Sequence, residues 1–314
     1  DKSNNRNKIT FFELITAAAF KAFSMIKSDI TILEVGLGGK LDATNVIEKP
    51  LISIITPIGI DHTDFLGKSI RKITSQKIGI IKKNTPVLVG KQSLLVNNMI
   101  KDYALKLKCK SYFYGKDWKV KKNTFCHNNS KIIIDDCGLE GIHQIDNSSL
   151  AIMSTLTIPQ LKVSREDILE GIKNVKWKGR LEKLKGRISH KYKNIEIWID
   201  SAHNVLGFKV LNYWLKKNSD IKLIILAIGK KKDAINIINE ISKSNPELII
   251  LNKDYNNFHD NKYLRKLIEK KGIKTKTFDN VFDSLKYCNY KYKKKKILIT
   301  GSIYFIGQIL YANN

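Results

Sequence analysis

Cysteines are few in this sequence, and none is spaced as a metal site or a redox pair requires. The 314 residues contain four cysteines, and no two of them form a CxxC motif. A zinc site assembled from Cys126, His127, Cys137 and His143 would have no standard spacing. No secretory leader is visible, so disulfide formation is not expected either. We therefore expect free thiols in a reduced, cytoplasmic protein.

Arginine is scarce although the chain is strongly basic. The formal net charge is +27, yet nearly all of the positive charge is lysine spread along the whole length. No nucleic-acid-binding motif accompanies the lysine runs at 230–232 and 293–296, which flank predicted strands. Such runs are typical of solvated faces, with electrostatic steering of an anionic substrate as the alternative. We expect no nucleic-acid partner.

Long hydrophobic runs free of charge are also absent. The most apolar stretch, residues 9–26, contains Glu13 and Lys21, which favours a buried core helix over a membrane span. Thr10 and Glu13 have the spacing of a capping box, which predicts that this helix begins there. Because the helix is apolar on most sides, we expect it to be buried, and we expect no membrane association.

A complete phosphate-binding P-loop is missing from the chain. The residues Gly67-Lys68-Ser69 resemble the end of one, but the motif requires a glycine five positions before Gly67, and that position is His62. The sequence begins with Asp1 and not with methionine, which suggests an absent N-terminal segment.

The first half of the chain is organised around residues 30–45. Apolar β-branched residues run into Glu34 and then into a glycine-rich turn. This pattern predicts a buried strand that delivers Glu34 to the rim of a sheet. A buried carboxylate requires a partner, which would be either a lysine in a salt bridge or a metal ion in a phosphate-handling site. Both interpretations remain open from this stretch alone.

The remaining pattern predicts an α/β protein with a boundary near Trp177. Before it we expect strands at 51–56, 86–89 and within 111–135, and helices at 69–81, 94–107, from about 147 to 156, and at 164–175. After it, strands at 195–200, 222–228, 247–252, near 275 and at 296–300 alternate with helices at 205–217, 232–243, 260–271, 281–289 and 303–311. Strict alternation predicts a doubly wound domain with ligands at the carboxyl ends of its strands. Two of these strand ends are followed by loops with polar or titratable side chains, at 200–204 and 300–304. The second loop leads into a helix whose N-terminus can bind an anion.

Seven motifs in this order resemble the folylpolyglutamate synthase and dihydrofolate synthase family, relatives of the Mur ligases. They are LEVGLGGKLDATN (33–45), GIDHTD (59–64), QKIGIIK (76–82), HQIDN (143–147), WKGRLE (177–182), DSAHN (200–204) and TGSIYFIG (300–307). The resemblance implies a Mur-ligase-like, P-loop-type ATPase domain at 1–176 that lacks its first strand and P-loop. A smaller Rossmann-like domain is implied at 177–314.

The resemblance also implies a reaction. Members of this family use ATP to join L-glutamate to the carboxyl group of a folate or dihydropteroate through an acyl phosphate. The implied cofactors are ATP and Mg²⁺, and the implied partners are L-glutamate and folate, tetrahydrofolate polyglutamates or dihydropteroate. A cytoplasmic monomer is expected.

By the same resemblance, Glu34 and His62 would hold magnesium, although nitrogen is an unusual ligand for this hard ion. Lys77 would carry a carbamate, which would turn a cation into an anionic oxygen ligand with a catalytic role. Without the family, a surface charge is the ordinary interpretation of one lysine.

Three further residues would contact ATP, namely Asn147, Arg180 and Asp200. For Asn147 a helix cap is the alternative, and for Arg180 a salt bridge in the linker. Two residues would bind glutamate, His203 and Ser302, and His203 would also be catalytic, although a lone histidine is often structural.

The chain departs from the family pattern in three places. Lys40 stands where the family usually has arginine, and DSAHNV (200–205) lacks the usual glycine and proline. The family's glycine-rich loop precedes the capping-box helix, and nothing before Thr10 supplies it. We therefore expect these 314 residues alone to lack ligase activity, the function belonging to the complete protein. The alternative is a truncated or degenerate, non-catalytic remnant of the family.

Overall fold

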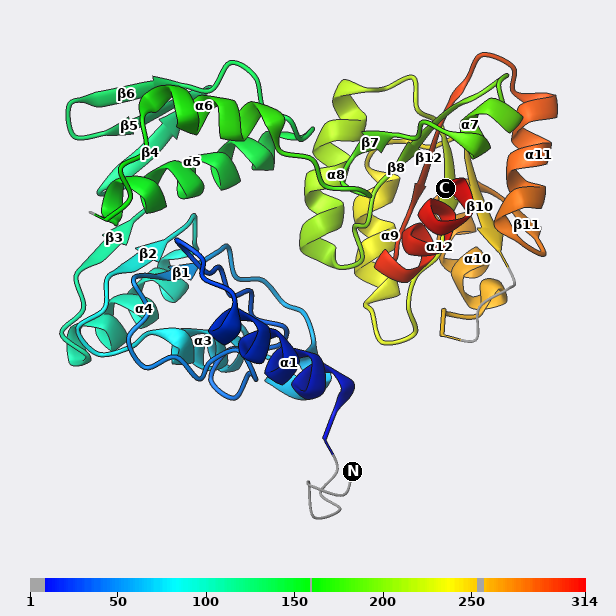
Figure 1. Ribbon diagram of the computed structural model, residues 1–314. Helices are drawn as coiled ribbons and strands as arrows, with labels where there is room; N and C mark the ends of the chain where they lie inside the picture. Colours follow the sequence, from blue (N-terminus) through cyan, green and yellow to red (C-terminus); the bar gives the residue numbers. More distant parts are fainter. Residues whose placement is uncertain (1–8, 159, 253–256) are drawn as a thin grey trace. The chain divides into compact units, whose positions relative to one another are not determined.

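The computed structural model describes residues 9–158, 160–252 and 257–314. It divides into two compact units, which are described separately below (Figure 1). Unit 1 comprises Asp1–Lys119 and Met153–Leu161, and unit 2 comprises Val120–Ile152 and Lys162–Asn314. Across the described ranges, no helix is both long enough and apolar enough to cross a lipid bilayer.

Unit 1 is built on a three-stranded parallel sheet in the order β1-β2-β3. The strands are β1 (Ser53–Ile55), β2 (Val87–Val89) and β3 (Ser111–Phe113), and the helices beside them are α2 (Thr63–Leu66), α3 (Ile70–Lys77), a 3₁₀ turn at Ile78–Ile80 and α4 (Leu94–Lys106). Ser69 caps α3 at the start of the predicted helix, and Ser93 caps α4. Residues from the sheet, the 3₁₀ turn and α4 form one apolar core, for example Val89, Ile78 and Ile100.

The first helix forms where the capping box predicts it but is not buried. In α1 (Phe11–Met25), the Thr10 side chain accepts the amide of Glu13, and the Glu13 carboxylate accepts the amide of Thr10. Thr16 is the one buried residue of this helix, and Phe11 is 77% exposed. The expectation of a buried helix is therefore wrong, because most of its side chains are exposed.

The predicted strand before Glu34 is also wrong. Residues 30–35 have no regular secondary structure, and Ile32 is 86% exposed. None of the described strands pairs with this segment, so its backbone has no ladder and its side chains have no facing layer. Glu34 is consequently exposed, and the cost of burying its charge does not arise.

A small three-stranded sheet has the order β4-β5-β6 and is formed by β4 (Trp118–Lys121), whose first two residues belong to unit 1, and by β5 (Thr124–His127) and β6 (Ser130–Ile133) of unit 2. Helix α5 (Ile142–Thr157) follows, with its residues up to Ile152 in unit 2 and the remainder in unit 1, and then α6 (Arg165–Asn174) of unit 2. Helix α6 begins at the predicted cap, where Ser164 and Asp167 exchange hydrogen bonds in a capping box. All four cysteines of the chain are free thiols, as expected.

The larger part of unit 2 is a six-stranded sheet in the order β11-β10-β9-β12-β8-β7. Its strands are β7 (Glu182–Lys183), β8 (Glu196–Ile199), β9 (Leu223–Leu226), β10 (Leu248–Asn252), β11 (Lys274–Phe278) and β12 (Lys296–Thr300). Its helices are α7 (Arg187–Lys191), α8 (Val205–Lys217), α9 (Ala234–Ser242), α10 (Asn261–Glu269), α11 (Val281–Lys291) and α12 (Ile303–Asn313). Strand β7 pairs antiparallel with β8, and the other pairings of this sheet are parallel. The sequence pattern predicted each of these strands and helices except β7 and α7.

Helices cover both faces of this sheet (Figure 1). One core contains side chains of α8, α9 and α10, and the other contains side chains of α7, α11 and α12. The chain therefore leaves β8 and β9 towards one face and leaves β12, which lies between them, towards the other. This doubly wound arrangement was predicted, and it opens a switch point at the carboxyl ends of β8, β12 and β9, where ligands of such folds bind.

Candidate functional site

In unit 1, the glycine-rich turn packs directly against the end of α3. The Lys40 amide donates to the carbonyl oxygen of Gln76 at 2.8 Å. A Cβ at Gly39 would lie 3.0 Å from the carbonyl oxygens of Gln76 and Lys77, and one at Gly79 would lie 2.4 Å from the Lys40 side chain. Only glycine allows this approach, so the fold brings the motifs at 33–45 and 76–82 together.

Lys77 lies half-buried in this contact, beside two carboxylates. Burial lowers the pKa of the Lys77 amine, and the nearby charges of Asp61 and Asp42 oppose this shift. Asp42 is held by the amides of Leu37 and Thr44, at 2.7 and 3.0 Å. A lowered pKa increases the fraction of neutral amine, which is the nucleophilic form of lysine. Lys77 is thus less exposed than an ordinary surface lysine, and its role as a metal ligand stays a prediction.

The two other predicted metal ligands of unit 1 are exposed. His62 has a left-handed backbone with φ of 50°, and its amide donates to Asp61 Oδ1 at 2.8 Å. Its Nε2 atom lies 3.8 Å from Asp61 Oδ2. Glu34 forms no hydrogen bond or ion pair with a described residue. Within 9–158, 160–252 and 257–314, no three His, Cys, Asp or Glu side chains come together as a metal site.

In unit 2, Asp200 lies at the end of β8, and both of its carboxylate oxygens accept backbone amides. Oδ1 accepts from Ala202 at 2.8 Å, and Oδ2 accepts from Leu181 at 3.1 Å. Burial raises the pKa of Asp200, while these two hydrogen bonds and the charges of Arg180 and His203 oppose the rise. Asp200 thereby ties the WKGRLE segment to the switch point of the sheet.

Arg180 is exposed and makes no hydrogen bond or ion pair with any residue that the structure describes. The predicted alternative of a linker salt bridge is therefore wrong within the described ranges. Its positive charge nevertheless acts on the buried Asp200 and the partly buried His143. Such an unpaired guanidinium keeps its donors available to an anionic ligand.

The HQIDN motif lies in the first turns of α5. The helix begins at Ile142, so the interpretation of Asn147 as a helix cap is wrong. Asn147 is exposed and donates to Gln144 Oε1 at 3.0 Å. Nδ1 of His143 is buried and has no hydrogen-bond partner among the described atoms. His143 was not among the residues predicted to be functional, although the HQIDN motif contains it.

His143 is expected to make the protein less stable as the pH falls. Burial, and next the charge of Arg180, lower its pKa from 6.5 to about 4. Between these values the unfolded chain binds a proton that the folded chain does not, so the free energy of unfolding falls with decreasing pH, by up to about 3 kcal/mol. Urea titrations at pH 7, 5.5 and 4.5 measure this slope.

His143→Gln should flatten that slope, since glutamine does not titrate. His190→Gln serves as the matched control, because His190 is exposed on α7, and it should keep the slope of the unmodified protein. An equal slope in His143→Gln and His190→Gln would contradict the prediction.

The loops after β8 and β12 leave the sheet side by side, because these strands pair in parallel with Ile199 opposite Ile299. In the first loop, Nδ1 of His203 lies 2.9 Å from the carbonyl oxygen of Ser201. In the second, Ser302 is the N-cap residue of α12 but makes no side-chain capping hydrogen bond. The hydroxyl of Thr300 is buried without a partner among the described atoms. The amides at the start of α12 are therefore available to an anionic group.

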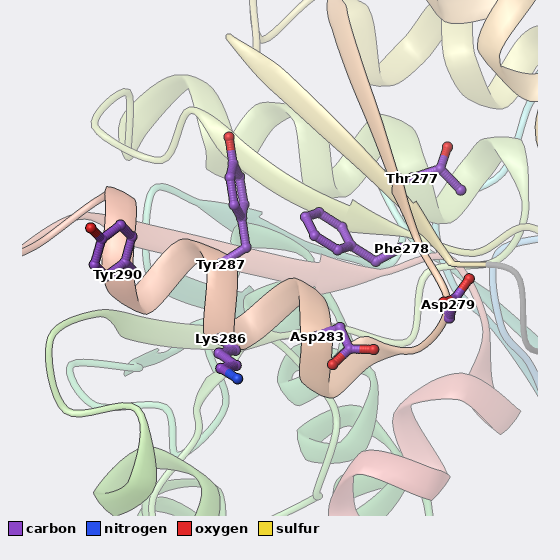
Figure 2. Close-up of a pocket in the computed structure, with 7 residues that line it drawn as sticks. All are labelled: Thr277, Phe278, Asp279, Asp283, Lys286, Tyr287 and Tyr290. Carbon is purple, nitrogen blue, oxygen red and sulfur yellow. The ribbon is translucent and has the colours of Figure 1, made fainter.

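A cavity of about 520 Å³ lies elsewhere, at the outer edge of the large sheet. Figure 2 shows that its lining side chains come from the end of β11 and from α11. They are Thr277, Phe278, Asp279, Asp283, Lys286, Tyr287 and Tyr290. None of these residues was predicted to be functional, and none belongs to the seven motifs.

Comparison with known proteins identifies relatives over nearly the whole chain. The probable dihydrofolate synthetase of Schizosaccharomyces pombe is 26% identical over 97% of this chain and 76% of its own length. The dihydrofolate synthase/folylpolyglutamate synthase of Bacillus subtilis is 28% identical over 96% of this chain and 71% of its own length. The Haemophilus influenzae protein of the same name is 30% identical, over 76% of this chain and 57% of its own length. No protein-family model matches the chain.

Solved structures share the fold. A Mycobacterium tuberculosis folylpolyglutamate synthase complexed with ADP and AMPPCP superposes with a TM-score of 0.87 at 24% identity, over 100% of this chain and 75% of that chain. The folylpolyglutamate synthase of Thermotoga maritima gives a TM-score of 0.77 at 27% identity, over 97% of this chain and 70% of that chain. The predicted α/β fold class is thereby confirmed.

Proposed function

Because the chain belongs to the folylpolyglutamate synthase and dihydrofolate synthase family, we propose that the protein carrying it is an ATP-dependent ligase. It joins L-glutamate to the carboxyl group of a folate or dihydropteroate through an acyl phosphate. The observation that supports this most directly is the Arg180 guanidinium, which lies near the switch point of the unit 2 sheet and has no ion-pair partner among the described residues. Phosphoryl transfer depends on positioning and on neutralising charge, and an arginine fork supplies both.

The unit 2 residues divide between two substrates. Arg180 binds an ATP phosphate, and Asn147, whose exposed side chain lies on α5, binds the adenine. Asp200 holds the backbone from which Arg180 projects. His203 and Ser302 bind glutamate, whose carboxylate suits the amides at the start of α12.

The unit 1 residues would hold Mg²⁺. Glu34 and a carbamate on Lys77 provide oxygen atoms, which this ion prefers, whereas the nitrogen of His62 is the less suitable donor. Because Mg²⁺ retains water and phosphate ligands, two or three protein donors are enough to hold it. When bound, the ion would neutralise charge on the ATP oxygens and the acceptor carboxylate.

The assay for this function is release of ADP from ATP that depends on both glutamate and a folate-type acceptor. Dihydropteroate and tetrahydrofolate are supplied in parallel, and each substrate is omitted in turn as a control. Release that requires both substrates supports the proposal. Binding of ADP without turnover for either acceptor would instead support the non-catalytic remnant.

His203→Ala is expected to raise KM for glutamate about tenfold and to change KM for ATP less than twofold, since loss of one charge-assisted contact costs roughly 1.5 kcal/mol. The exposed His190 provides the matched control, His190→Ala, which should leave both constants unchanged. Steady-state kinetics with each substrate varied in turn give the two values. A larger effect on KM for ATP than for glutamate would overturn the assignment.

A further inference from the structure

The backbone on both sides of Arg180 is fixed by hydrogen bonds. The amide of Gly179 donates to Glu182 Oε1 at 2.6 Å, and the carbonyl oxygen of Gly179 accepts the amide of Ser201 at 2.9 Å. On the other side, the amide of Leu181 donates to Asp200 at 3.1 Å. Strand β7 starts at Glu182, which pairs with Ile199 of β8. The turn is thus anchored to the loop that begins at Asp200.

In this turn, the residues on both sides of one exposed arginine have a left-handed backbone conformation. Gly179 has a φ of 76°, and Leu181 has a φ of 46°, which is unusual for a leucine. A non-glycine residue is strained in this conformation. The Leu181 side chain is 2% exposed and packs in the core formed with α8, and this burial offsets the strain. Arg180, between the two, is left in solvent.

Glu182 lies two positions from Arg180, but the two side chains do not form an ion pair with each other. Neither forms an ion pair with any other described residue. Glu182 directs a carboxylate oxygen to the Gly179 amide instead. A Cβ at position 179 would lie 2.9 Å from both Ser201 Oγ and Ile306 Cγ2, so the backbone at this end of the turn is closely confined. The carboxylate therefore acts on the shape of the turn and leaves the guanidinium unpaired.

We propose that Glu182 is a positioning residue that fixes the 179–182 turn so that Arg180 is presented to a phosphate group of the nucleotide. This role rests on the proposed function, since it names ATP as the ligand. This role differs from a role in folding, because Glu182 can then affect KM for ATP only while Arg180 is present. A guanidinium held in place before binding loses less freedom when the phosphate arrives.

Kinetics of five proteins, the unmodified protein and four variants, test whether the effect passes through Arg180. Glu182→Ala removes the acceptor and is expected to raise KM for ATP about tenfold, whereas Glu182→Gln retains an oxygen acceptor and should stay within twofold of the unmodified protein. In an Arg180→Ala background, adding Glu182→Ala should change KM for ATP less than twofold. The same tenfold loss in both backgrounds would overturn the proposal, as would a Glu182→Gln variant as impaired as Glu182→Ala.

A second measurement does not depend on activity. The chain has arginine at six positions, so the Nε–H signals of the arginine side chains can be resolved by NMR and that of Arg180 assigned from Arg180→Lys. The order parameter of this group should fall in Glu182→Ala and not in Glu182→Gln. An unchanged order parameter in Glu182→Ala would refute the positioning role. If order falls while the unmodified protein releases no ADP, the positioning role stands and the proposed ligase function fails.

Discussion

Arg180→Ala is expected to lower kcat/KM for ATP about 100- to 1,000-fold, which makes it one of the two most damaging single changes in this chain. An arginine fork on a phosphate forms two charge-assisted hydrogen bonds, and removing such a donor from developing charge costs roughly 3–4 kcal/mol. Among the described residues, Arg180 has no hydrogen-bond or ion-pair partner. The substitution therefore leaves no other side chain without its partner, and the expected loss is that of the phosphate contact alone. Steady-state kinetics with ATP varied at saturating glutamate measure the effect.

Two further variants separate the fork from the charge. Arg180→Lys retains the charge but loses bidentate geometry, so it should recover less than a tenth of the lost activity. Arg187→Ala removes an exposed arginine at the start of α7, outside the site, and should leave kcat/KM unchanged. If Arg187→Ala and Arg180→Ala caused equal losses, the effect would be one of general surface charge, and the assignment of Arg180 would fail.

The second half of the chain could be predicted closely from its sequence because each element there carries its own signals. Helix α8 extends over Val205–Lys217 as predicted, with Asn204 as its cap, and β12 begins and ends at the predicted residues. Apolar runs of four to five residues alternate with amphipathic segments, and both faces of the sheet are covered within this part of the chain. Local pattern and tertiary packing therefore agree.

The first forty residues could not be predicted in the same way, because an apolar run indicates burial without indicating what covers it. Ile30 and Ile32 read as a strand, but strand formation requires a paired neighbour, and the described strands provide none. The capping box of α1 was predicted correctly because Thr10 and Glu13 satisfy each other locally. Local interactions were thus predictable here, and tertiary ones were not.

The contacts of the candidate-site residues could likewise not be predicted from the sequence. Asp200 was assigned to ATP, yet both of its oxygens accept backbone amides, and one of these amides lies 19 positions away at Leu181. Glu182 stands in a motif that was recognised, but nothing in its residue type indicates that it bonds to Gly179 and leaves Arg180 free. Such roles depend on where the backbone turns, which periodicity does not report.

Lys77→Arg is expected to reduce glutamate-dependent ADP release at least about 1,000-fold, because under the proposed function it removes the lysine whose carbamate holds the metal ion. Carbamate formation requires a neutral amine: the nitrogen bonds to the carbon of CO₂ and releases a proton to solvent. Burial lowers the pKa of Lys77 and so favours that amine, while Asp61 and Asp42 oppose the shift. Arginine keeps the charge, but its guanidinium stays protonated and cannot make this bond.

Lys72→Arg is the matched control, because Lys72 is an exposed lysine of the same helix and should tolerate the change. Removing CO₂ from the buffer should lower the activity of the unmodified protein, and bicarbonate should restore it. The Lys77→Arg variant should not respond to either treatment. Carbon-13 NMR with labelled bicarbonate should show a carbamate signal that Lys77→Arg lacks and Lys72→Arg retains. A fully active protein whose Lys77 carries only a free amine would eliminate the carbamate and leave Glu34 and His62 as the metal ligands assigned in unit 1.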